Sequence, residues 1–507
     1  MGSELIDESW AALTAGDDDV TPAPVAVSGH AGRLPSRFAV EEVAIACVAT
    51  ALRAAVALQP SGSSQPVRLD RGHVADACRS ERFFAVDGRA AGASFAPLSR
   101  FWPAADGWVR SHANYPWHRR ALLDALEVSG DVEVAADAVG AAIGTLRCQE
   151  FEERVFAAGG AGAAVRSFGA WRRHPQGRVV GAEPLISCDM AGNAPPRAAP
   201  IRPRVLDLTR VIAGPVCTRL LAALGSDVLR VDSPRRRDMA SGTFADTLLG
   251  KRSCTLDLTT PAGMERLRAL LDEADILVHG YRPGALDRFG LSAAEIAERH
   301  PGTVVVIVDA WGHQGPWAAR RGFDSVVQAA TGLAAGESPG GGEPGALPCQ
   351  LLDHGTGYLA AAAALDGLRR QRRHGGTPIR RVSLTRTAWW LATTPAQPDE
   401  GSLPDEDKGG FLVQIPADGH TIAAVAPPGH IAGEPLRWPH AGHGYGGDPP
   451  TWGSARQGDH VSFSRPCSPR RASRELDWAR VCRPGHPVPG RVIRLPARAQ
   501  PATGGGD

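Results

Sequence analysis

The sequence lacks the marks of several large classes of protein. Its 55 basic and 54 acidic side chains almost cancel, so the basic surplus typical of nucleic-acid binders is absent. The nine cysteines are scattered, with no C-x-x-C pair, which argues against a disulfide framework or a zinc site and predicts free thiols in a reducing cytoplasm. No run of ~18 apolar residues predicts a membrane span. The acidic start of the chain is not expected to be a signal peptide.

What the sequence does contain is a globular composition with a regular pattern in its middle. Hydrophobic residues make up 43% of the 507, enough for about two to four domains. Strand-like runs begin at Arg204 and alternate with helical segments, one opened by Thr260 and Pro261 and another by the capping box Ser292 to Glu295. The strand-like runs are 205–208, 227–231, 252–258, 276–279 and 303–309. This alternation predicts an α/β fold with an open, mainly parallel, Rossmann-like sheet.

The remaining segments differ in composition and suggest further divisions of the chain. Residues 1–35 are polar and rich in small side chains, which predicts a mobile arm. Residues 36–190 regain apolar periodicity, with helices expected at 40–58 and 115–126, and predict a smaller α+β domain. The proline-rich and alanine-rich stretch 191–203 is a linker to the sheet domain, 204–395. Beyond it we expect a C-terminal extension, 396–440, and a disordered tail, 441–507.

Two segments of the chain resemble each other weakly. Residues 43–69 and 359–385 both show an alanine-rich helix, a polar turn and a short strand. The first is either a degenerate copy of the second or a chance similarity between two alanine-rich helices. When the two are overlaid, Asp353 falls near Arg37, where no acid stands.

Asp353 occupies an unusual place for a charge, between an apolar run and a helix expected at 359–368. The positive end of the helix dipole would keep such a carboxylate ionised, and Gly355 and Gly357 would leave space for another molecule. Two interpretations follow from these residues. Asp353 is either an N-cap of the helix or a nucleophile that forms a covalent acyl intermediate.

A series of motifs in fixed order carries a resemblance to a known family. They are residues 205–215, 224–232, 250–258, 281–291, 312–317, 321–324 and 348–358. In sequence and spacing they resemble the class III CoA-transferases, the CaiB/BaiF family, which includes formyl-CoA transferase, L-carnitine CoA-transferase and 2-methylacyl-CoA racemase. The resemblance aligns Asp353 with the family's nucleophilic aspartate and makes 204–395 the CoA-binding domain.

The resemblance implies a reaction and its partners. CoA would move from an acyl-CoA donor to an organic carboxylic acid through an aspartyl acyl anhydride and an aspartyl-CoA thioester on Asp353. Such chemistry requires backbone N–H donors near the developing oxyanion, and the glycine-rich segment after Asp353 is the expected source. Coenzyme A is then a co-substrate, no cofactor is expected to bind tightly, and the protein is expected to be a homodimer.

By position, the family's nucleotide contacts fall on residues that follow the predicted strands. They are Ile212, Ala213, Ser233, Leu256, Asp257, Leu258, Thr259, Tyr281, Arg282, Arg288, Arg321, Phe323 and Asp324. Arg282 and Arg288 suit phosphate because a guanidinium binds its oxygens in a bidentate way, although Arg288 also fits a solvated helix face. Ser233 departs from the arginine that some family members carry. Lys251 and Arg252 fit a charged strand end.

Two departures leave other functions open. The racemase branch uses a histidine between the residues matched by Gly322 and Asp324, whereas this chain has Phe323, which carries no proton. Epimerisation is therefore the alternative to CoA transfer, with His354 as a substitute base. The segment 106–126 resembles the family's small domain but precedes the first strand, so the chain is permuted or derives from a two-copy ancestor. A catalytically silent CoA-binding relative is the third alternative.

Overall fold

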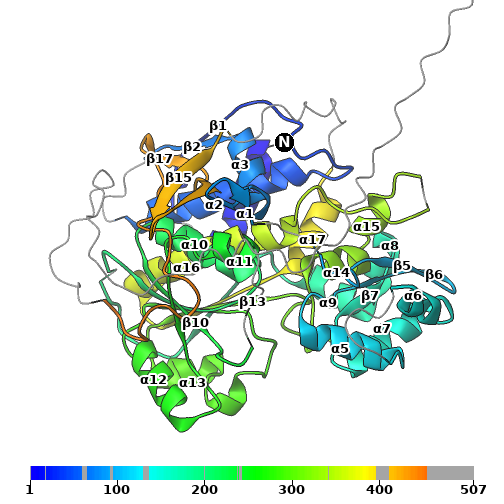
Figure 1. Cartoon of the computed structure of the whole chain (residues 1–507). Helices are drawn as coiled ribbons and strands as arrows, with labels where there is room; N and C mark the ends of the chain where they lie inside the picture. Colours follow the sequence, from blue (N-terminus) through cyan, green and yellow to red (C-terminus); the bar gives the residue numbers. More distant parts are fainter. Residues whose placement is uncertain are drawn as a thin grey trace, which may run out of the picture.

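The computed structural model describes residues 2–17, 19–59, 65–91, 95–129, 136–198, 200–236, 238, 242–340, 342–395 and 410–453. At its centre is a seven-stranded sheet (Figure 1). In spatial order its strands are β11 (Arg252–Thr255), β10 (Asp227–Asp232), β9 (Arg204–Leu208), β12 (Ile276–His279), β13 (Val304–Asp309), β14 (Thr377–Ser383) and β8 (Ser187–Ala191). All neighbours are parallel except β14 and β8. The predicted α/β fold with a mainly parallel sheet is confirmed.

Helices cover both faces of this sheet (Figure 1). One face carries α10 (Ala213–Ala223) and α16 (Leu351–His374), and the other carries α12 (Pro261–Leu271) and α13 (Ala293–Arg299). The predicted helix starts are confirmed. The Thr260 hydroxyl accepts from the Gly263 N–H at 3.2 Å, and Ser292 and Glu295 form a capping box.

A further helical layer packs on α16. It consists of α2 (Val40–Leu58) and α1 (Gly2–Thr14). The structure differs here from the mobile arm predicted for residues 1–35. Leu5, Ile6, Trp10 and Leu13 lie on one side of α1 and are buried, because their spacing matches the helical repeat. Burial of these four large apolar side chains holds the helix in place, although most residues of the segment are small or polar.

The N-terminal and C-terminal parts of the chain share two small sheets. In one, β1 (Val25–Ser28) pairs with β2 (Val67–Asp70), which pairs with β17 (His430–Ile431), followed by β18 (Glu434–Pro435). In the other, the hairpin of β15 (Leu412–Ala417) and β16 (His420–Val425) extends β3 (Ala85–Val86) and β4 (Arg89–Ala90). The C-terminal extension therefore packs on the N-terminal part.

The two similar segments have the same order of elements. In the first, α2 and β2 lead into α3 (Arg71–Ala77), and in the second, α16 and β14 lead into α17 (Leu384–Thr393). When the helix starts are overlaid, Glu42 rather than Arg37 takes the third helical position that Asp353 holds in α16. The Glu42 carboxylate lies 3.6 Å from the guanidinium of Arg71, so this acid forms an ion pair.

A separate lobe packs beside the sheet domain (Figure 1). Its strands are β5 (Phe101–Ala104), β6 (Gly107–Ser111) and β7 (Gly162–Ala164), and its helices are α5 (Pro116–Ala125), α6 (Ala136–Gly144) and α7 (Cys148–Ala157). A core of its own includes Trp102, Leu122 and Phe151. The Arg166 N–H donates to the Ala329 carbonyl at 3.0 Å, which joins this lobe to α14 (Asp324–Thr331). The displaced segment 106–126 thus lies in a lobe that contacts the sheet domain.

The shorter elements connect these layers. They are α4 (Ser80–Phe83), α8 (Phe168–Arg173), α9 (Pro175–Ala182), α11 (Gly242–Thr247), η1 (Asp287–Phe289) and α15 (Leu333–Gly336). Of the helices described, none is both long and apolar enough to cross a membrane. Most of the predicted tail, 454–507, and residues 396–409 lie outside the described residues. Residues 441–453, predicted to be disordered, instead pack on the sheet domain, where the Asp448 carboxylate accepts from the Ser253 N–H at 2.8 Å.

Close packing between α16 and α10 gives a first prediction. A Cβ on Gly357 would lie 2.4 Å from the Ala213 carbonyl oxygen and 2.9 Å from the Val216 Cβ. Replacing Gly357 with alanine is therefore expected to lower the free energy of unfolding by about 1–3 kcal/mol, because two helices must move apart. Urea denaturation measures the change. Gly144, where an added Cβ meets nothing within 4 Å, is the control, and an equal loss in both variants would contradict the packing argument.

Candidate active site

Asp353 lies inside the first turn of α16. The helix begins at Leu351, its N-cap residue is Gln350, and Asp353 is the third helical residue. The interpretation of Asp353 as the N-cap is therefore wrong. Its backbone N–H donates to the Asp324 carboxylate at 3.0 Å. The Asp324 side chain therefore binds the helix turn that carries the Asp353 side chain.

The surroundings of Asp353 favour its protonated form. Only 4% of the residue is exposed, and burial, followed by the nearby carboxylates of Asp324 and Glu81, raises its pKa well above the ordinary value. The expectation that the helix dipole keeps Asp353 ionised is thus wrong. A helix terminus contributes about 0.3–1 kcal/mol to a charge at the surface, which is less than the cost of removing a carboxylate from water.

The two glycines after Asp353 serve helix packing. A Cβ on Gly355 would lie 3.3 Å from the Cys47 sulfur of α2, and Gly357 faces the backbone of α10. The space predicted for another molecule is therefore filled by protein. Because both residues lie within α16, their N–H groups bond to carbonyls of the preceding turn, so they are not the oxyanion donors that the sequence suggested.

Asp324 is the centre of a second set of contacts. It opens α14, is fully buried, and its carboxylate also accepts a hydrogen bond from the Gln328 amide. The carbonyl of that amide accepts from the Leu347 N–H at 3.0 Å. Burial raises the pKa of Asp324 to about 6, although the hydrogen bonds from Asp353 and Gln328 act against it. Burial lowers the pKa of Arg110 of β6 to about 10, and the charge of Asp324 acts against this shift.

The third carboxyl group of the site comes from the N-terminal part of the chain. It belongs to Glu81 of α4. One oxygen of the Glu81 carboxyl group lies 3.2 Å from Nε2 of His354, and both side chains are buried. Burial raises the pKa of Glu81, but the hydrogen bond and charge of His354 bring the net value below the ordinary one. Sequence reasoning missed Glu81, because no local pattern connects it with a residue 273 positions later.

An imidazole occupies the neighbourhood of Phe323. The His112 ring stacks on the Phe323 ring, with centroids 3.6 Å apart and an interplanar angle of 7°. Burial, with the charges of His118 and Arg110, lowers the pKa of His112 well below its ordinary value, so the ring is neutral. The segment that seemed displaced in sequence thus contributes a neutral base beside the residue that precedes Asp324.

The predicted nucleotide contacts lie in several parts of the fold. Most follow the carboxyl ends of β9, β10, β11 and β12, and the order of strands reverses between β9 and β12, where open α/β sheets bind ligands. This group consists of Ile212, Ala213, Ser233, Leu256, Asp257, Leu258, Thr259, Tyr281 and Arg282. Asp324 lies beside Asp353, whose backbone N–H donates to its carboxylate, and Phe323 directly precedes Asp324. Arg288 is exposed and its guanidinium lies 4.6 Å from the ring of its neighbour Phe289.

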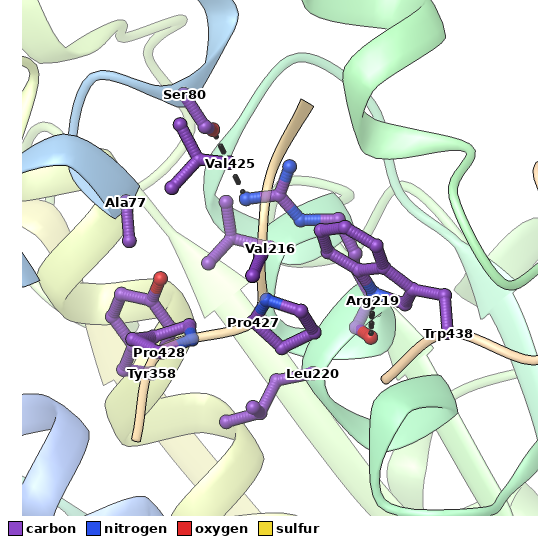
Figure 2. Close-up of a pocket in the computed structure, with 11 residues that line it drawn as sticks. Ala77, Ser80, Val216, Arg219, Leu220, Tyr358, Val425, Pro427, Pro428 and Trp438 are labelled. Atoms are coloured by element: carbon purple, nitrogen blue, oxygen red, sulfur yellow. Dashed lines mark hydrogen bonds between the residues drawn. The ribbon is translucent and has the colours of Figure 1, made fainter. Parts of the chain in front are cut away.

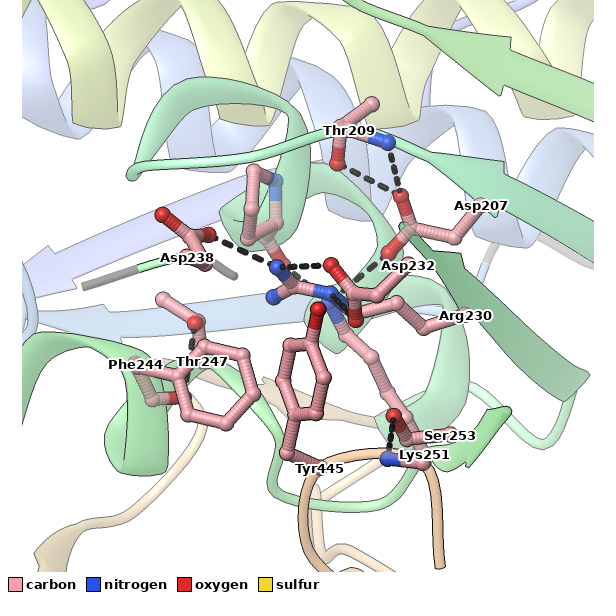
Figure 3. A network of polar contacts seen from close by, with 12 residues as sticks. Asp207, Thr209, Arg230, Asp232, Asp238, Phe244, Thr247, Lys251, Ser253 and Tyr445 are labelled. Carbon is pink, nitrogen blue, oxygen red and sulfur yellow. Dashed lines mark hydrogen bonds and ion pairs between the residues drawn. The ribbon is translucent and has the colours of Figure 1, made fainter. Parts of the chain in front are cut away.

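A buried network of charged side chains lies around β9, β10 and the residues before β11 (Figure 3). The Lys251 ammonium donates to the Asp207 carboxylate at 3.1 Å and to the Pro215 carbonyl at 2.8 Å, and both charged residues are fully buried. Asp207 also accepts from Thr209 and Thr218. Lys251 is therefore a member of an internal ion pair and does not cap a strand end, as the sequence suggested.

A small hollow lies between α10, α16 and the loop after β16 (Figure 2). Its walls include Val216, Leu220, Trp438 and the polar side chains of Arg219 and Tyr358. The Arg219 guanidinium forms an ion pair with Asp246. Asp353 does not line this hollow.

The raised pKa of Asp353 gives a prediction for the pH dependence of any reaction that uses it as a nucleophile. An acid with a raised pKa stays protonated at low pH, so kcat is expected to rise with pH as the proton leaves. Replacing Asp324 with asparagine removes one negative charge that raises this pKa, so the rise should move to lower pH by roughly one unit. Glu183→Gln, at a half-buried carboxyl elsewhere, is the control. An unchanged profile in Asp324→Asn would contradict the coupling.

Comparisons with known proteins agree with the motifs. Residues 203–410 match the model of CoA-transferase family III. A probable fatty acyl-CoA transferase of Mycobacterium tuberculosis is 29% identical over 46% of this chain and 68% of its own length. An acyl-CoA transferase of Gibberella moniliformis is 32% identical over 57% of this chain and 55% of its own. The chain thus spans between about half and two thirds of these relatives.

A solved structure was also found. A CaiB/BaiF family protein from Brucella suis is 27% identical, with 38% of this chain and 54% of that chain covered and a TM-score of 0.35. The resemblance predicted from the ordered motifs is confirmed by the family match, which supports a CoA-transferase enzyme.

Proposed function

We propose that this protein transfers CoA from an acyl-CoA donor to an organic carboxylic acid, with Asp353 as the nucleophile. The observation that carries the proposal is the position of Asp353. It lies in the part of the chain that matches the family, in the first turn of a buried helix, and its turn is bound by a second carboxyl group, Asp324.

The reaction proceeds in balanced steps. Once ionised, the Asp353 carboxylate attacks the thioester carbonyl, the C–S bond breaks, and CoA leaves as a thiolate. The thiolate attacks the aspartyl carbonyl of the anhydride, which releases the donor's acid and leaves an aspartyl-CoA thioester. The acceptor carboxylate then attacks this thioester, and the CoA thiolate released attacks the acceptor's carbonyl in the new anhydride. Asp353 is regenerated as a carboxylate.

The enclosure of Asp353 supports this scheme. Anhydrides and thioesters hydrolyse when water reaches them, and a site that excludes water protects them. Asp353, Asp324, Glu81 and His354 are all at most 4% exposed. The closed surroundings also explain the raised pKa of Asp353, so ionisation of this residue is part of the cost of the first step.

Trapping tests the proposal. The protein is incubated with an acyl-CoA donor and hydroxylamine, and the modified residue is located by mass spectrometry. A hydroxamate on Asp353 that forms only with the donor is the expected result. A hydroxamate at another carboxyl group, or transfer that proceeds at the normal rate without any trapped species, would contradict the assignment. A screen of donors and acids then defines the substrates. A homodimer in the cytoplasm stays a prediction, for which sedimentation measures the oligomeric state.

One observation favours a second function, epimerisation at the carbon next to the thioester. Phe323 lacks a titratable proton, but the neutral His112 ring stacked on it places a base beside the residue that precedes Asp324. A base and a protonated acid near one carbon are what proton removal and return require. Incorporation of solvent deuterium into a 2-methylacyl-CoA, without any acceptor acid, would support this function. Its absence under conditions where CoA transfer occurs would exclude it.

A further inference from the structure

We propose that Arg110, His112 and His118 of the lobe form a binding site for the carboxylate of the organic acid substrate. All three residues lie outside the part of the chain that matches the family, residues 203–410. The identity of the ligand rests on the proposed function, because that reaction takes up one carboxylic acid and releases another. The presence of an anion site rests on the three side chains themselves.

Arg110 of β6 carries a buried charge without a counter-ion in contact. Only 5% of the residue is exposed. Among the described residues, its Nε has no hydrogen-bond partner and its guanidinium is in no ion pair. The guanidinium lies 4.7 Å from the ring centre of Phe95 and 5.1 Å from that of Phe101. Contacts with rings offset only part of the cost of burying a charge, so the arrangement favours the binding of an anion.

The acid whose charge acts on Arg110 is Asp324, and its oxygens already have partners. The Asp324 carboxylate accepts hydrogen bonds from the Gln328 amide and from the Asp353 N–H. Its charge opposes the effect of burial on the pKa of Arg110 without a direct ion pair between the two side chains. The Arg110 guanidinium is therefore available to an anion from outside, while Asp324 binds the helix turn of the proposed nucleophile.

Two imidazoles beside Arg110 provide the second, independent sign of a ligand. His112 follows β6 directly and continues its pairing with β7, since its backbone N–H donates to the Ala161 carbonyl at 2.9 Å. Arg110 and His112 are two positions apart in this extended segment, so their side chains point to the same face. The ring centroids of His112 and His118 are 6.4 Å apart. Both residues are at most 5% exposed, and among the described residues neither Nδ1 has a hydrogen-bond partner. Buried polar atoms without partners are rare and costly, so a ligand oxygen that supplied the missing hydrogen bonds would be favoured.

The charges of the cluster select an anion. Burial, followed by the charge of Arg321, lowers the pKa of His118 to about 3, and the pKa of His112 also lies well below its ordinary value. Both rings are therefore neutral at pH 7, and each carries one N–H that can donate a hydrogen bond. One guanidinium with two neutral donors suits a carboxylate and repels a cation.

The cluster extends from the surface to the residues beside the nucleophile. Phe95 is 45% exposed, and its ring centroid lies 6.3 Å from that of His112. The His112 ring in turn stacks on Phe323, which directly precedes Asp324. Aromatic rings around a charged group give apolar contact to the carbon body of a ligand. An organic acid uses both the rings and the charge, whereas an inorganic anion uses only the charge.

Ligands that differ in charge and little in shape test the site. Dissociation constants are measured by calorimetry on the full chain for benzoate and butyrate and for their amides, with wild type, Arg110→Met and His112→Phe. Arg110→Met is expected to weaken binding of the acids by about tenfold or more, the typical loss of a charge-assisted hydrogen bond. His112→Phe keeps a ring against Phe323 and removes the ring nitrogens, and it is expected to weaken binding roughly fivefold. Binding of the amides should not change. Arg100→Met, at an exposed arginine of the same lobe, is the matched control.

Stability without ligand separates a binding role from a structural one. Arg110→Met removes a buried charge that has no counter-ion in contact, so the urea midpoint of the free protein is expected to stay the same or to rise. A structural arginine would instead give a lower midpoint, with equal weakening of acid and amide binding.

The remaining outcomes each decide the proposal. No acid binding by the wild type, or no loss in either variant, overturns it. A loss for CoA without a loss for the acids would assign the cluster to phosphate and overturn it as well. Because binding is measured without turnover, charge-dependent acid binding in a protein that does not transfer CoA would refute only the proposed function. CoA transfer with unchanged acid binding in Arg110→Met would refute only the carboxylate site.

Discussion

Replacement of Asp353 by asparagine is expected to lower kcat for CoA transfer by about 10⁴-fold or more, since loss of a nucleophile removes the covalent route. The amide has the shape of the protonated acid, and burial with the charges of Asp324 and Glu81 favours that form in the native protein. The free energy of unfolding is therefore expected to change little. Steady-state transfer assays and urea denaturation of the same preparations measure both quantities.

The control for this result is another carboxyl group with a raised pKa. Asp309 at the end of β13 has a pKa raised to about 7 by burial, and it accepts a hydrogen bond from the Gly312 N–H that asparagine also accepts. Asp309→Asn is expected to keep the rate of transfer. If Asp353→Asn retained a tenth of the wild-type rate, or if Asp309→Asn lost as much activity, the assignment of the nucleophile would be wrong.

Replacement of Asp207 by asparagine is expected to lower the free energy of unfolding by about 3–5 kcal/mol, because it leaves the Lys251 ammonium buried without a counter-ion. Burial already lowers the pKa of Lys251 to about 8, against the opposing effect of Asp207, so removal of the carboxylate lowers it further. Lys251 is then expected to lose its proton at neutral pH. Urea denaturation measures the loss.

Two further variants separate the ion pair from its surroundings. The double variant Asp207→Asn, Lys251→Met removes both charges and is expected to recover part of the stability, since no unpaired charge stays buried. Asp227→Asn breaks a pair with Arg252 in which the two side chains are 18% and 17% exposed and their atoms lie 2.8 Å apart, and it is expected to cost about 0–1 kcal/mol. If Asp207→Asn and Asp227→Asn lowered the free energy of unfolding equally, burial of the Asp207–Lys251 pair would not be the cause of the loss.

The helices and strands of the sheet domain were predictable because their signals are local. Thr260 with Pro261, and Ser292 with Glu295, marked two helix starts within a few residues, and the valine-rich run before Asp309 marked a strand buried on both faces. The antiparallel edge strand β8 was not predicted. Its exposed, mixed residues carry no strand pattern, and its place is set by pairing with β14.

The surroundings of Asp353 were less predictable. Sequence order does not reveal the contact between the Asp353 N–H and the Asp324 carboxylate, because 29 positions separate the two residues. Glu81 and His112 reach the same place from more than 200 residues away in the chain. Their contribution depends on how the N-terminal helices and the lobe pack, and no spacing along the chain encodes that.

The sequence by itself determined the α/β class, the order of the central elements and the identity of Asp353 as the candidate nucleophile, because local patterns and ordered motifs carry that information. Only the tertiary structure decided the state of this carboxyl group. Burial and two acids from distant segments raise its pKa, where the local helix suggested an ionised residue. Charge in a protein interior depends on the whole shell of neighbours, and long-range packing assembles that shell.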